Sequence, residues 1–314
     1  MKRLLVTGRH GFVGSTLARL VDSDPSLRAW QLATISEQFE ILDVDAVRRL
    51  VDDAAPDAVV HLAARSSVAE SLRDPEGTLR VNLFGTLNLL RALDDARFSG
   101  PLLFVSSGDV YGNVPEHRLP VDENQPPSPR NPYAVSKVAA EALCRQWALT
   151  SNKRVVVARP FNHIGPGQGE QFAIPAFVRQ IAEIRAGLCP PVVAVGDIDV
   201  TRDFTDVRDI VRGYFALLER GVSGEVYNVC SGQERTVRSL LERLIELAGV
   251  AVEITQDAAR LRPAEHRRAA GDPGKINQAT GWRARTPLDE SLCAMLEAFE
   301  ASREPSGEPS DAGR

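Results

Sequence analysis

The feature that most constrains this chain is a glycine-rich turn close to its N-terminus. Gly8, Gly11 and Gly14 recur at every third position, after an apolar run from Arg3 to Thr7 and before apolar residues with helical spacing. Glycines let the backbone of such a turn approach a ligand closely, and the free N–H groups at the start of the helix attract an anion. We therefore predict a strand–turn–helix unit that binds the pyrophosphate of a dinucleotide. The alternative is that the glycines only permit a tight turn between the strand and the helix and bind no ligand.

Other apolar runs in the first half of the chain show no alternation between apolar and polar residues. Strands of this kind are typically buried on both faces of a parallel sheet. Because helical patterns lie between the runs, we predict an α/β fold, a Rossmann-type doubly wound parallel sheet with helices on both faces and a smaller C-terminal lobe. The further predicted strands are Asp57–Ala64, Pro101–Ser106 and Arg154–Ala158, and the predicted helices are Asp45–Ala54, Thr78–Arg97 and Ser136–Leu149.

The composition and the hydrophobic pattern of the sequence change after Pro160, where the segments become irregular and richer in proline and glycine. We predict a dinucleotide-binding domain from residues 1–163, to which a segment at about 203–230 returns, and a substrate-binding lobe from about 164–202 and 231–303. Residues 304–314 combine proline, serine, glycine and charged residues and are predicted to be disordered.

Composition narrows the class of function. The formal net charge of −5 argues against a nucleic-acid-binding surface. The cysteines, Cys144, Cys189, Cys230 and Cys293, lack the spacing of a metal site or a disulfide framework, so we expect no metal and free thiols in a reducing cytoplasm. No apolar stretch reaches the roughly 20 residues that span a bilayer, and we expect no membrane partner.

A tyrosine and a lysine four residues apart, Tyr133 and Lys137, form a candidate acid–base pair. On a helix this spacing places both side chains on one face, and we expect the ammonium group to lower the pKa of the phenol. Ser107 follows a predicted strand at the sheet edge where ligands bind, and its hydroxyl could bond a reacting carbonyl oxygen. Taken alone, Tyr133 and Lys137 could also be solvent-exposed residues of a helix with no catalytic role.

Together with these motifs, the chain resembles the extended short-chain dehydrogenases/reductases of the nucleotide-sugar-modifying branch. Within that branch, segments in the second half of the chain resemble the GDP-mannose dehydratase/reductase group. The matching segments are the glycine turn, His61–Ala64, Asn82 with Gly85-Thr86, Ser106–Gly112, Tyr133 with Lys137, Arg159–Gln168, Val195–Phe204, Tyr227–Gln233 and Leu261–Glu265.

The resemblance implies roles for individual residues and a reduced nicotinamide cofactor, NADPH or NADH. It implies a homodimer formed through the helices around Thr78–Arg97 and Ser136–Leu149. The alternatives are a backbone hydrogen bond inside the sheet for Asn82, an exposed loop carboxylate in place of an adenine contact for Asp43, surface charge for the arginines, and core packing for the hydrophobic faces of the dimer helices. The implied catalytic residues are Ser107, Tyr133, Lys137 and Asp109; the implied cofactor-binding residues are Gly8, Gly11, Phe12, Val13, Gly14, Asp43, Leu62, Ala63, Ala64, Asn82, Tyr133 and Lys137; and the implied substrate-binding residues are Ser107, Asn162, Arg202, Arg262 and Glu265.

The residues after Ser107 bear on the reaction. By the resemblance, 4,6-dehydratases of this family usually carry two acidic residues there, whereas this chain has Gly108 and Asp109. The missing carboxylate disfavours elimination, although some dehydratases keep only the second one. We therefore expect reduction of the 4-keto group of a GDP-linked 4-keto-6-deoxyhexose, GDP-4-dehydro-6-deoxy-D-mannose, to GDP-D-rhamnose. The alternatives are a nucleotide-sugar 4-epimerase, a 4,6-dehydratase and a non-catalytic dinucleotide sensor; the configuration at C4 stays open.

Overall fold

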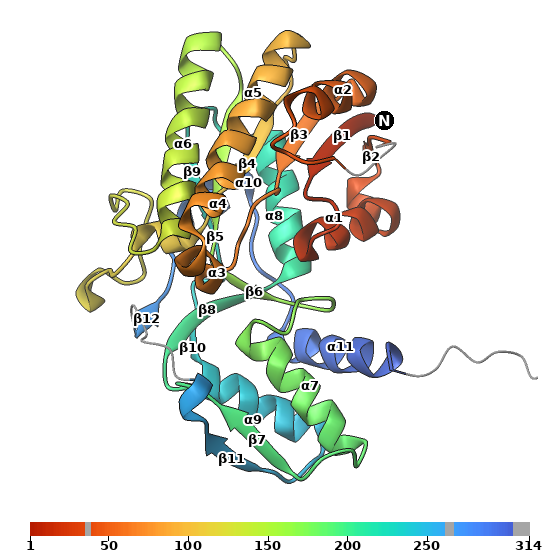
Figure 1. The fold of residues 1–314 in the computed structure, drawn as a ribbon, viewed down its shortest axis with the longest axis vertical. Coiled ribbons are helices and arrows are strands. Elements are labelled where there is room, and N and C mark those ends of the chain that lie inside the picture. Colours follow the sequence, from red (N-terminus) through yellow and green to blue (C-terminus); the bar gives the residue numbers. More distant parts are fainter. Residues whose placement is uncertain (35–38, 261–266, 304–314) are drawn as a thin grey trace, which may run out of the picture.

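The computed structural model describes residues 1–34, 39–260 and 267–303, which form a larger domain and a smaller domain (Figure 1). The predicted disordered tail, the predicted substrate residues Arg262 and Glu265, and residues 35–38 after the second strand lie outside the described residues.

The larger domain is built on six parallel strands in the order β2-β1-β3-β4-β5-β9. Leu4 and Val6 of β1 point into one core and Leu5 into the other, so both faces of the sheet are apolar. This double burial explains the apolar runs without alternation and confirms the predicted parallel α/β sheet. The strand bounds are Lys2–Thr7 for β1, Trp30–Leu32 for β2, Ala58–His61 for β3, Leu102–Val105 for β4, Val155–Pro160 for β5 and Val226–Val229 for β9.

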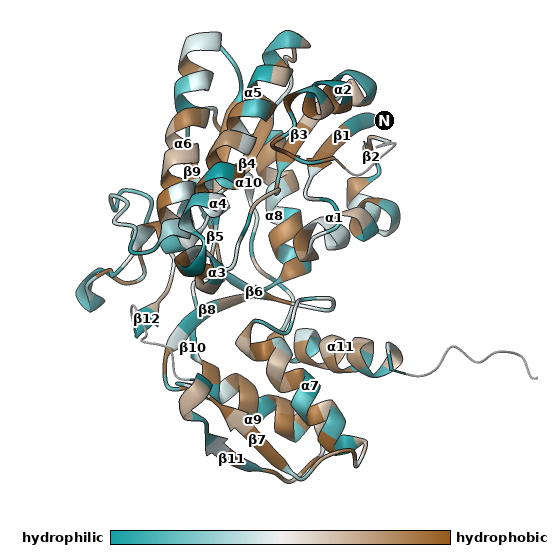
Figure 2. Ribbon diagram, viewed as in Figure 1, coloured by the Kyte–Doolittle hydropathy of each residue, from teal (hydrophilic) through white to brown (hydrophobic). Residues whose placement is uncertain are grey.

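Helices cover both faces of this sheet. One core packs the sheet against α1 (Phe12–Ser23), α8 (Val207–Arg220) and α10 (Gly274–Thr280), and the other packs it against α2 (Val44–Ala54), α5 (Gly85–Asp95) and α6 (Pro132–Ser151). Figure 2 shows the hydrophobic residues gathered along the central strands. The layers follow from helical periodicity, since each helix buries one apolar stripe.

The predicted helix Thr78–Arg97 is confirmed, but it contains a π-helical turn that the sequence did not predict. After α3 (Val68–Arg73), the chain forms α4 (Pro75–Leu79), a π-helical turn at Arg80–Phe84 and then α5. The turn holds Asn82, whose side chain bonds neighbouring segments rather than solvent. A π-helical turn inserts one extra residue per turn, which reorients a side chain without ending the helix.

The smaller domain has its own apolar core. The helices α7 (Ala173–Arg185), α9 (Val237–Ala248) and α11 (Leu288–Ala301) pack on the strand pair β7 (Val192–Val195) and β11 (Glu253–Gln256). A second small sheet lies between the two domains in Figure 1 and contains β6 (Asn162–Ile164), β8 (Thr201–Asp206), β10 (Glu234–Thr236) and β12 (Arg268–Ala269).

The chain crosses between the domains more often than the predicted boundaries allow. Strand β8, predicted to start the segment that returns to the large domain, instead pairs with β6, β10 and β12. Within the predicted lobe segment 231–303, α10 and Trp282 pack in the core of the large sheet. These returns depend on contacts between distant segments, which local patterning does not encode.

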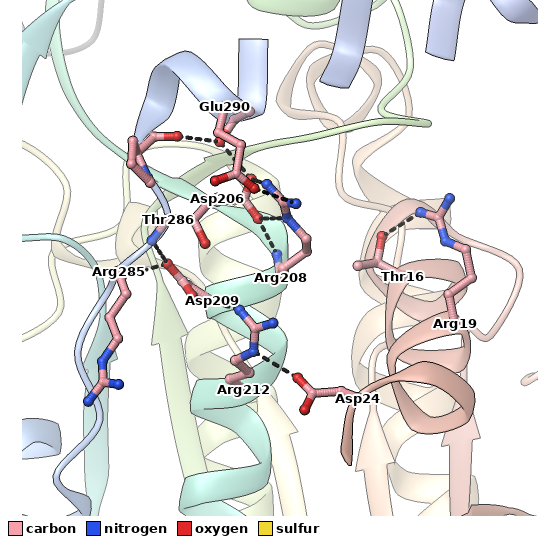
Figure 3. Close-up of polar contacts among 12 residues, drawn as sticks. Thr16, Arg19, Asp24, Asp206, Arg208, Asp209, Arg212, Arg285, Thr286 and Glu290 are labelled. Carbon is pink, nitrogen blue, oxygen red and sulfur yellow. Dashed lines mark hydrogen bonds and ion pairs between the residues drawn. The ribbon is translucent and has the colours of Figure 1, made fainter. Parts of the chain in front are cut away.

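Buried carboxylates at the start of α8 fasten the C-terminal segment to the larger domain (Figure 3). Asp209 is 1% exposed, and its carboxylate accepts hydrogen bonds from the backbone N–H groups of Arg285 (2.7 Å) and Thr286 (2.6 Å). The Asp206 carboxylate accepts a hydrogen bond from the hydroxyl of Ser291 on α11 at 2.6 Å. These contacts fix how α11 and the smaller domain leave the larger one.

Candidate active site

The glycine turn leaves a bare backbone surface at the carboxyl end of β1. Gly8 has φ +75°, and a Cβ there would lie 2.8 Å from the backbone nitrogen of Ala63. A Cβ on Gly14 would overlap the carbonyl oxygen of Gly8. The first turn of α1 has no acidic residue. The turn therefore offers backbone N–H groups and a helix N-terminus to an anion, and a dinucleotide pyrophosphate fits it.

His61, at the end of β3, is hydrogen-bonded to the residue directly before this turn. Its imidazole is hydrogen-bonded through Nδ1 to the Thr7 hydroxyl at 2.6 Å and through Nε2 to the Thr86 hydroxyl at 2.9 Å. Burial lowers the pKa of His61 to about 3, so the ring is neutral near pH 7. This histidine therefore has a structural role. The residues after it, Leu62, Ala63 and Ala64, line a cavity of about 620 Å³ together with Gly8, Gly11, Phe12, Val13 and Gly14.

Ser107, Tyr133 and Lys137 meet at the wall of the same cavity. Tyr133 and Lys137 lie one turn apart on α6, whose N-terminus is capped by Asn131, so the helix begins four residues before the predicted Ser136. The Lys137 ammonium group donates a hydrogen bond to the carbonyl oxygen of Val105 at 2.8 Å. The Ser107 hydroxyl oxygen accepts the backbone N–H of Asp109 at 3.2 Å, and the serine side chain is also hydrogen-bonded to Tyr133.

The charge state of the tyrosine differs from the sequence-based expectation. Burial, and then the negative charge of Asp109, raise the pKa of Tyr133 above its ordinary value, while a hydrogen bond with Ser107 lowers it less. Burial lowers the pKa of Lys137 to about 8. The predicted depression of the Tyr133 pKa by Lys137 is therefore wrong here, because loss of solvation dominates for the phenol. The tyrosine is held in its protonated form.

Asp109 and Gly108 occupy a 3₁₀ turn, Gly108–Tyr111, that begins at Ser107. Both line the cavity. A Cβ on Gly108 would lie 3.1 Å from the ring of Phe161, so this ring occupies the space next to the position where related dehydratases carry an acid. Asp109 is thus the carboxylate that this turn places in the cavity wall.

Two predicted cofactor residues lie outside the residues described as lining the cavity. The Asn82 side chain accepts the backbone N–H of Arg65 at 2.8 Å and donates to the hydroxyl of Ser136 at 2.8 Å. These contacts favour its structural interpretation, but they join a loop to α6 rather than lying inside the sheet. The Asp43 carboxylate caps α2 by accepting the N–H groups of Asp45 and Ala46. Contact of Asp43 with adenine stays a prediction.

The predicted substrate residues are only partly brought together. Asn162, at the start of β6, lines the cavity. Arg202, on β8, donates hydrogen bonds to the carbonyl oxygens of Thr201 (2.7 Å) and Arg267 (3.3 Å), and it is not among the described cavity-lining residues. Its role toward a diphosphate stays a prediction.

Several cavity residues escaped the sequence analysis. The His163 ring is hydrogen-bonded to the Phe161 carbonyl oxygen at 2.9 Å and stacks on Phe12 with 5.8 Å between ring centres. Arg268 also lines the cavity, and its guanidinium group donates a hydrogen bond to the Glu234 carboxylate. These residues come from segments far apart in sequence, so no local spacing could group them. Ser106, Gln168 and Tyr214 are further lining residues that were not predicted as site residues.

Within the described residues, no cluster of three or more histidine, cysteine, aspartate or glutamate side chains could hold a metal ion. No helix in those ranges is long and apolar enough to cross a membrane.

Comparison with known proteins extends this geometry. Residues 26–295 match the family model described as GDP-mannose 4,6 dehydratase. The chain is 49% identical over 300 residues to the GDP-6-deoxy-D-mannose reductase of Pseudomonas aeruginosa, covering 96% of this chain and 98% of that protein. The solved structure of RMD from Pseudomonas aeruginosa complexed with NADPH superposes with a TM-score of 0.92 at 48% identity, covering 96% of this chain and 98% of that one. A UDP-glucose 4-epimerase of Thermotoga maritima, solved with UDP-glucose, has a TM-score of 0.83 at 26% identity over 96% of this chain and 99% of that one.

Proposed function

This chain belongs to the GDP-mannose 4,6-dehydratase family of the extended short-chain dehydrogenases/reductases, and on that premise we propose that it reduces GDP-4-dehydro-6-deoxy-D-mannose to GDP-D-rhamnose. The observation that carries the proposal is one cavity that joins the glycine turn to Ser107, Tyr133 and Lys137, in a chain 49% identical to a GDP-6-deoxy-D-mannose reductase. The enzyme is an oxidoreductase that uses NADPH or NADH.

The cofactor fits the residues that are present. The bare backbone of the glycine turn would hold the pyrophosphate, and Leu62, Ala63 and Ala64 would line the path of the dinucleotide. The reduced nicotinamide, when bound, supplies the hydride that C4 of the sugar receives. Lys137 uses one ammonium donor on Val105, so two donors remain for the hydroxyl groups of the nicotinamide ribose.

Tyr133 supplies the proton that this reduction consumes. Because burial and Asp109 raise the pKa of Tyr133, its phenol is protonated near neutral pH and can donate to the oxygen that forms at C4. The Ser107 side chain is hydrogen-bonded to Tyr133 in this structure, and with substrate bound its hydroxyl proton can turn to the same oxygen while that oxygen is still a carbonyl. A raised tyrosine pKa thus suits reduction, which needs an acid.

The substrate would bind to residues from several segments of the chain. We assign the sugar to Asn162 and Asp109 in the cavity wall, and the GDP diphosphate to Arg202 and Arg262, with Glu265 at the ribose. A guanidinium group suits a diphosphate because its donors form a planar fork. The Asp109 carboxylate beside Tyr133 also favours a second candidate function, a 4,6-dehydratase. The 4-epimerase alternative shares the same catalytic residues, whereas the residues assembled here weigh against a non-catalytic sensor.

We propose that the enzyme prefers NADPH to NADH. Arg9 and His10 stand inside the glycine turn, and Arg9 is half-buried there. A guanidinium group in this turn is suited to the 2′-phosphate that distinguishes NADPH from NADH. Replacing Arg9 by alanine should lower kcat/KM with NADPH and leave kcat/KM with NADH nearly unchanged; an equal loss with both would remove this assignment.

The first experiment is an assay of the purified protein with GDP-4-keto-6-deoxy-D-mannose and, in separate reactions, NADPH and NADH. Loss of the reduced-nicotinamide absorbance, in one-to-one proportion to a GDP-deoxyhexose product, is the expected result. Chemical identification of that product also assigns the configuration at C4. No cofactor consumption, with NAD bound tightly to the purified protein, would point instead to the epimerase or the dehydratase.

We further propose a homodimer and a cytoplasmic location. Phe84 (53% exposed) and Val135 (43% exposed) leave apolar surface on the predicted dimer helices, and α6 contacts the π-helical turn that carries Phe84. A Phe84→Lys variant should shift the mass measured by light scattering from dimer to monomer. The four cysteines are free thiols, which suits a reducing cytoplasm.

A further inference from the structure

Three buried polar atoms in the cavity wall have no hydrogen-bond partner among the described residues. They are the hydroxyl oxygens of Ser106 and Tyr214 and the Oε1 atom of Gln168. The Gln168 amide is otherwise engaged, since its nitrogen donates to the carbonyl oxygen of His163 at 2.9 Å. The two hydroxyls are different, because each can both donate and accept a hydrogen bond.

The buried position of the Tyr214 hydroxyl is energetically unfavourable as long as it has no hydrogen-bond partner. Tyr214 is fully buried on α8, in the apolar core of the large sheet with Ile210 and Leu217. A buried polar group without a partner destabilises the fold, and nearly all such groups in native proteins are satisfied. A phenylalanine would fill the same core space without this cost. The hydroxyl is therefore expected to meet a group that is not part of the polypeptide.

Both hydroxyls lie at the catalytic end of the cavity. Ser106 directly precedes Ser107, at the point where β4 ends. Tyr214 is close enough to Tyr133 for the two phenols to interact electrostatically, an interaction that adds to burial in raising the pKa of Tyr214. The group that satisfies these hydroxyls must therefore lie near the reacting atoms, away from the adenosine end of a dinucleotide.

We propose that the hydroxyl groups of Tyr214 and Ser106 bind the nicotinamide half of the cofactor, which makes Tyr214 a cofactor-binding residue contributed by α8. The nicotinamide carboxamide carries both donors and an acceptor, and its ribose carries hydroxyls, so this half of the dinucleotide matches two hydroxyls that can donate or accept. The inference rests on the proposed function only in assuming a nicotinamide dinucleotide in this cavity.

The test compares NADPH with 2′-phospho-ADP-ribose, a fragment that lacks the nicotinamide ring. Calorimetric titration of the wild type and of Tyr214→Phe should show about a tenfold loss of NADPH affinity in the variant and no loss for the fragment, as expected for one hydrogen bond. Ser106→Ala should behave in the same way. Without cofactor, Tyr214→Phe should melt at the wild-type temperature or higher, since an unpaired hydroxyl has been removed.

Two matched variants control for the loss of a buried hydroxyl in general. Tyr227→Phe removes a hydroxyl that accepts the backbone N–H of Val222 at 3.1 Å, and it should lower the melting temperature without changing NADPH affinity. Thr205→Val removes a buried unpaired hydroxyl that is not among the described cavity-lining groups, and it should leave NADPH affinity unchanged.

Three results would overturn the inference: unchanged NADPH affinity in Tyr214→Phe, an equal loss for NADPH and the fragment, or a lower melting temperature without cofactor. The last result would mean that an ordered water satisfies the hydroxyl within the fold. Failure of the proposed function has a different signature, because the wild type itself would then bind NADPH without reducing the keto sugar, or would not bind it.

Discussion

Replacing Glu141 with glutamine should destabilise the protein strongly, because the change leaves a buried arginine without its counter-charge. Glu141 lies on α6 and Arg159 on β5, and they are 4% and 3% exposed. Two hydrogen bonds join them, from Nε to Oε1 at 2.9 Å and from Nη2 to Oε2 at 2.6 Å. The guanidinium group also stacks 4.8 Å from the ring centre of Tyr111. The pair therefore connects the catalytic helix to the strand that leads into the substrate side of the cavity.

The size of the effect follows from this burial. Removing one partner of a buried ion pair typically costs about 3–5 kcal/mol, a large part of the roughly 5–15 kcal/mol that stabilises a folded protein. For a chain of this size, each kcal/mol corresponds to about 2 °C in Tm, so Glu141→Gln should lower Tm by about 6–10 °C.

The assay is thermal and urea unfolding of the wild type, Glu141→Gln, Arg159→Met and the double variant Glu141→Leu/Arg159→Met. The double variant should recover most of the stability, because it leaves no buried charge. Glu225→Gln is the matched control: it breaks the 2.7 Å pair with Lys275 at the surface and should cost about 1 kcal/mol or less. A loss below about 1 kcal/mol for Glu141→Gln, or a double variant as unstable as the two single losses added together, would refute the reasoning.

The other predictions concern the catalytic residues and their surroundings. Tyr133→Phe should lower kcat by about 10²–10⁴-fold and keep NADPH affinity by calorimetry, and near wild-type turnover would contradict its role as the acid. Because burial lowers the pKa of Lys137 to about 8, the lysine loses its charge above that pH, and kcat/KM should fall there; a pH profile that stays flat well above pH 8 would speak against a cationic role. The pKa of His61 is about 3 in the fold against 6.5 for an ordinary histidine, so only the unfolded chain gains this proton as the pH falls from 6.5. Between about pH 6.5 and pH 3, stability should then decrease by about 1.4 kcal/mol for each pH unit, and urea unfolding of a His61→Asn variant should show a weaker pH dependence. Gly108→Asp places a Cβ 3.1 Å from the Phe161 ring, so product analysis should show reduced keto-sugar reduction and no elimination; elimination would mean that this one carboxylate decides the reaction type.

Much of the fold could be predicted because its signals are local. The glycine spacing, the apolar runs and the helical patterns each depend on neighbouring residues, and the first, third, fourth and fifth strands lie where those runs predicted them. The same holds for Tyr133 and Lys137, since a four-residue spacing on a helix fixes their common face. The resemblance supplied the roles that spacing could not, and roles such as that of Asn162 stay predictions.

Only the tertiary structure decided what depends on burial and on segments that are distant in sequence. The sequence predicted a lowered tyrosine pKa from one neighbouring charge, whereas the fold removes the phenol of Tyr133 from water and raises the pKa. The helical pattern around Tyr214 describes an ordinary core residue, and only the assembled cavity shows its hydroxyl without a partner. The return of Trp282 to the large sheet is likewise set by packing. Solvation and long-range packing belong to the whole assembled fold, and the spacing of residues along one segment carries no record of them.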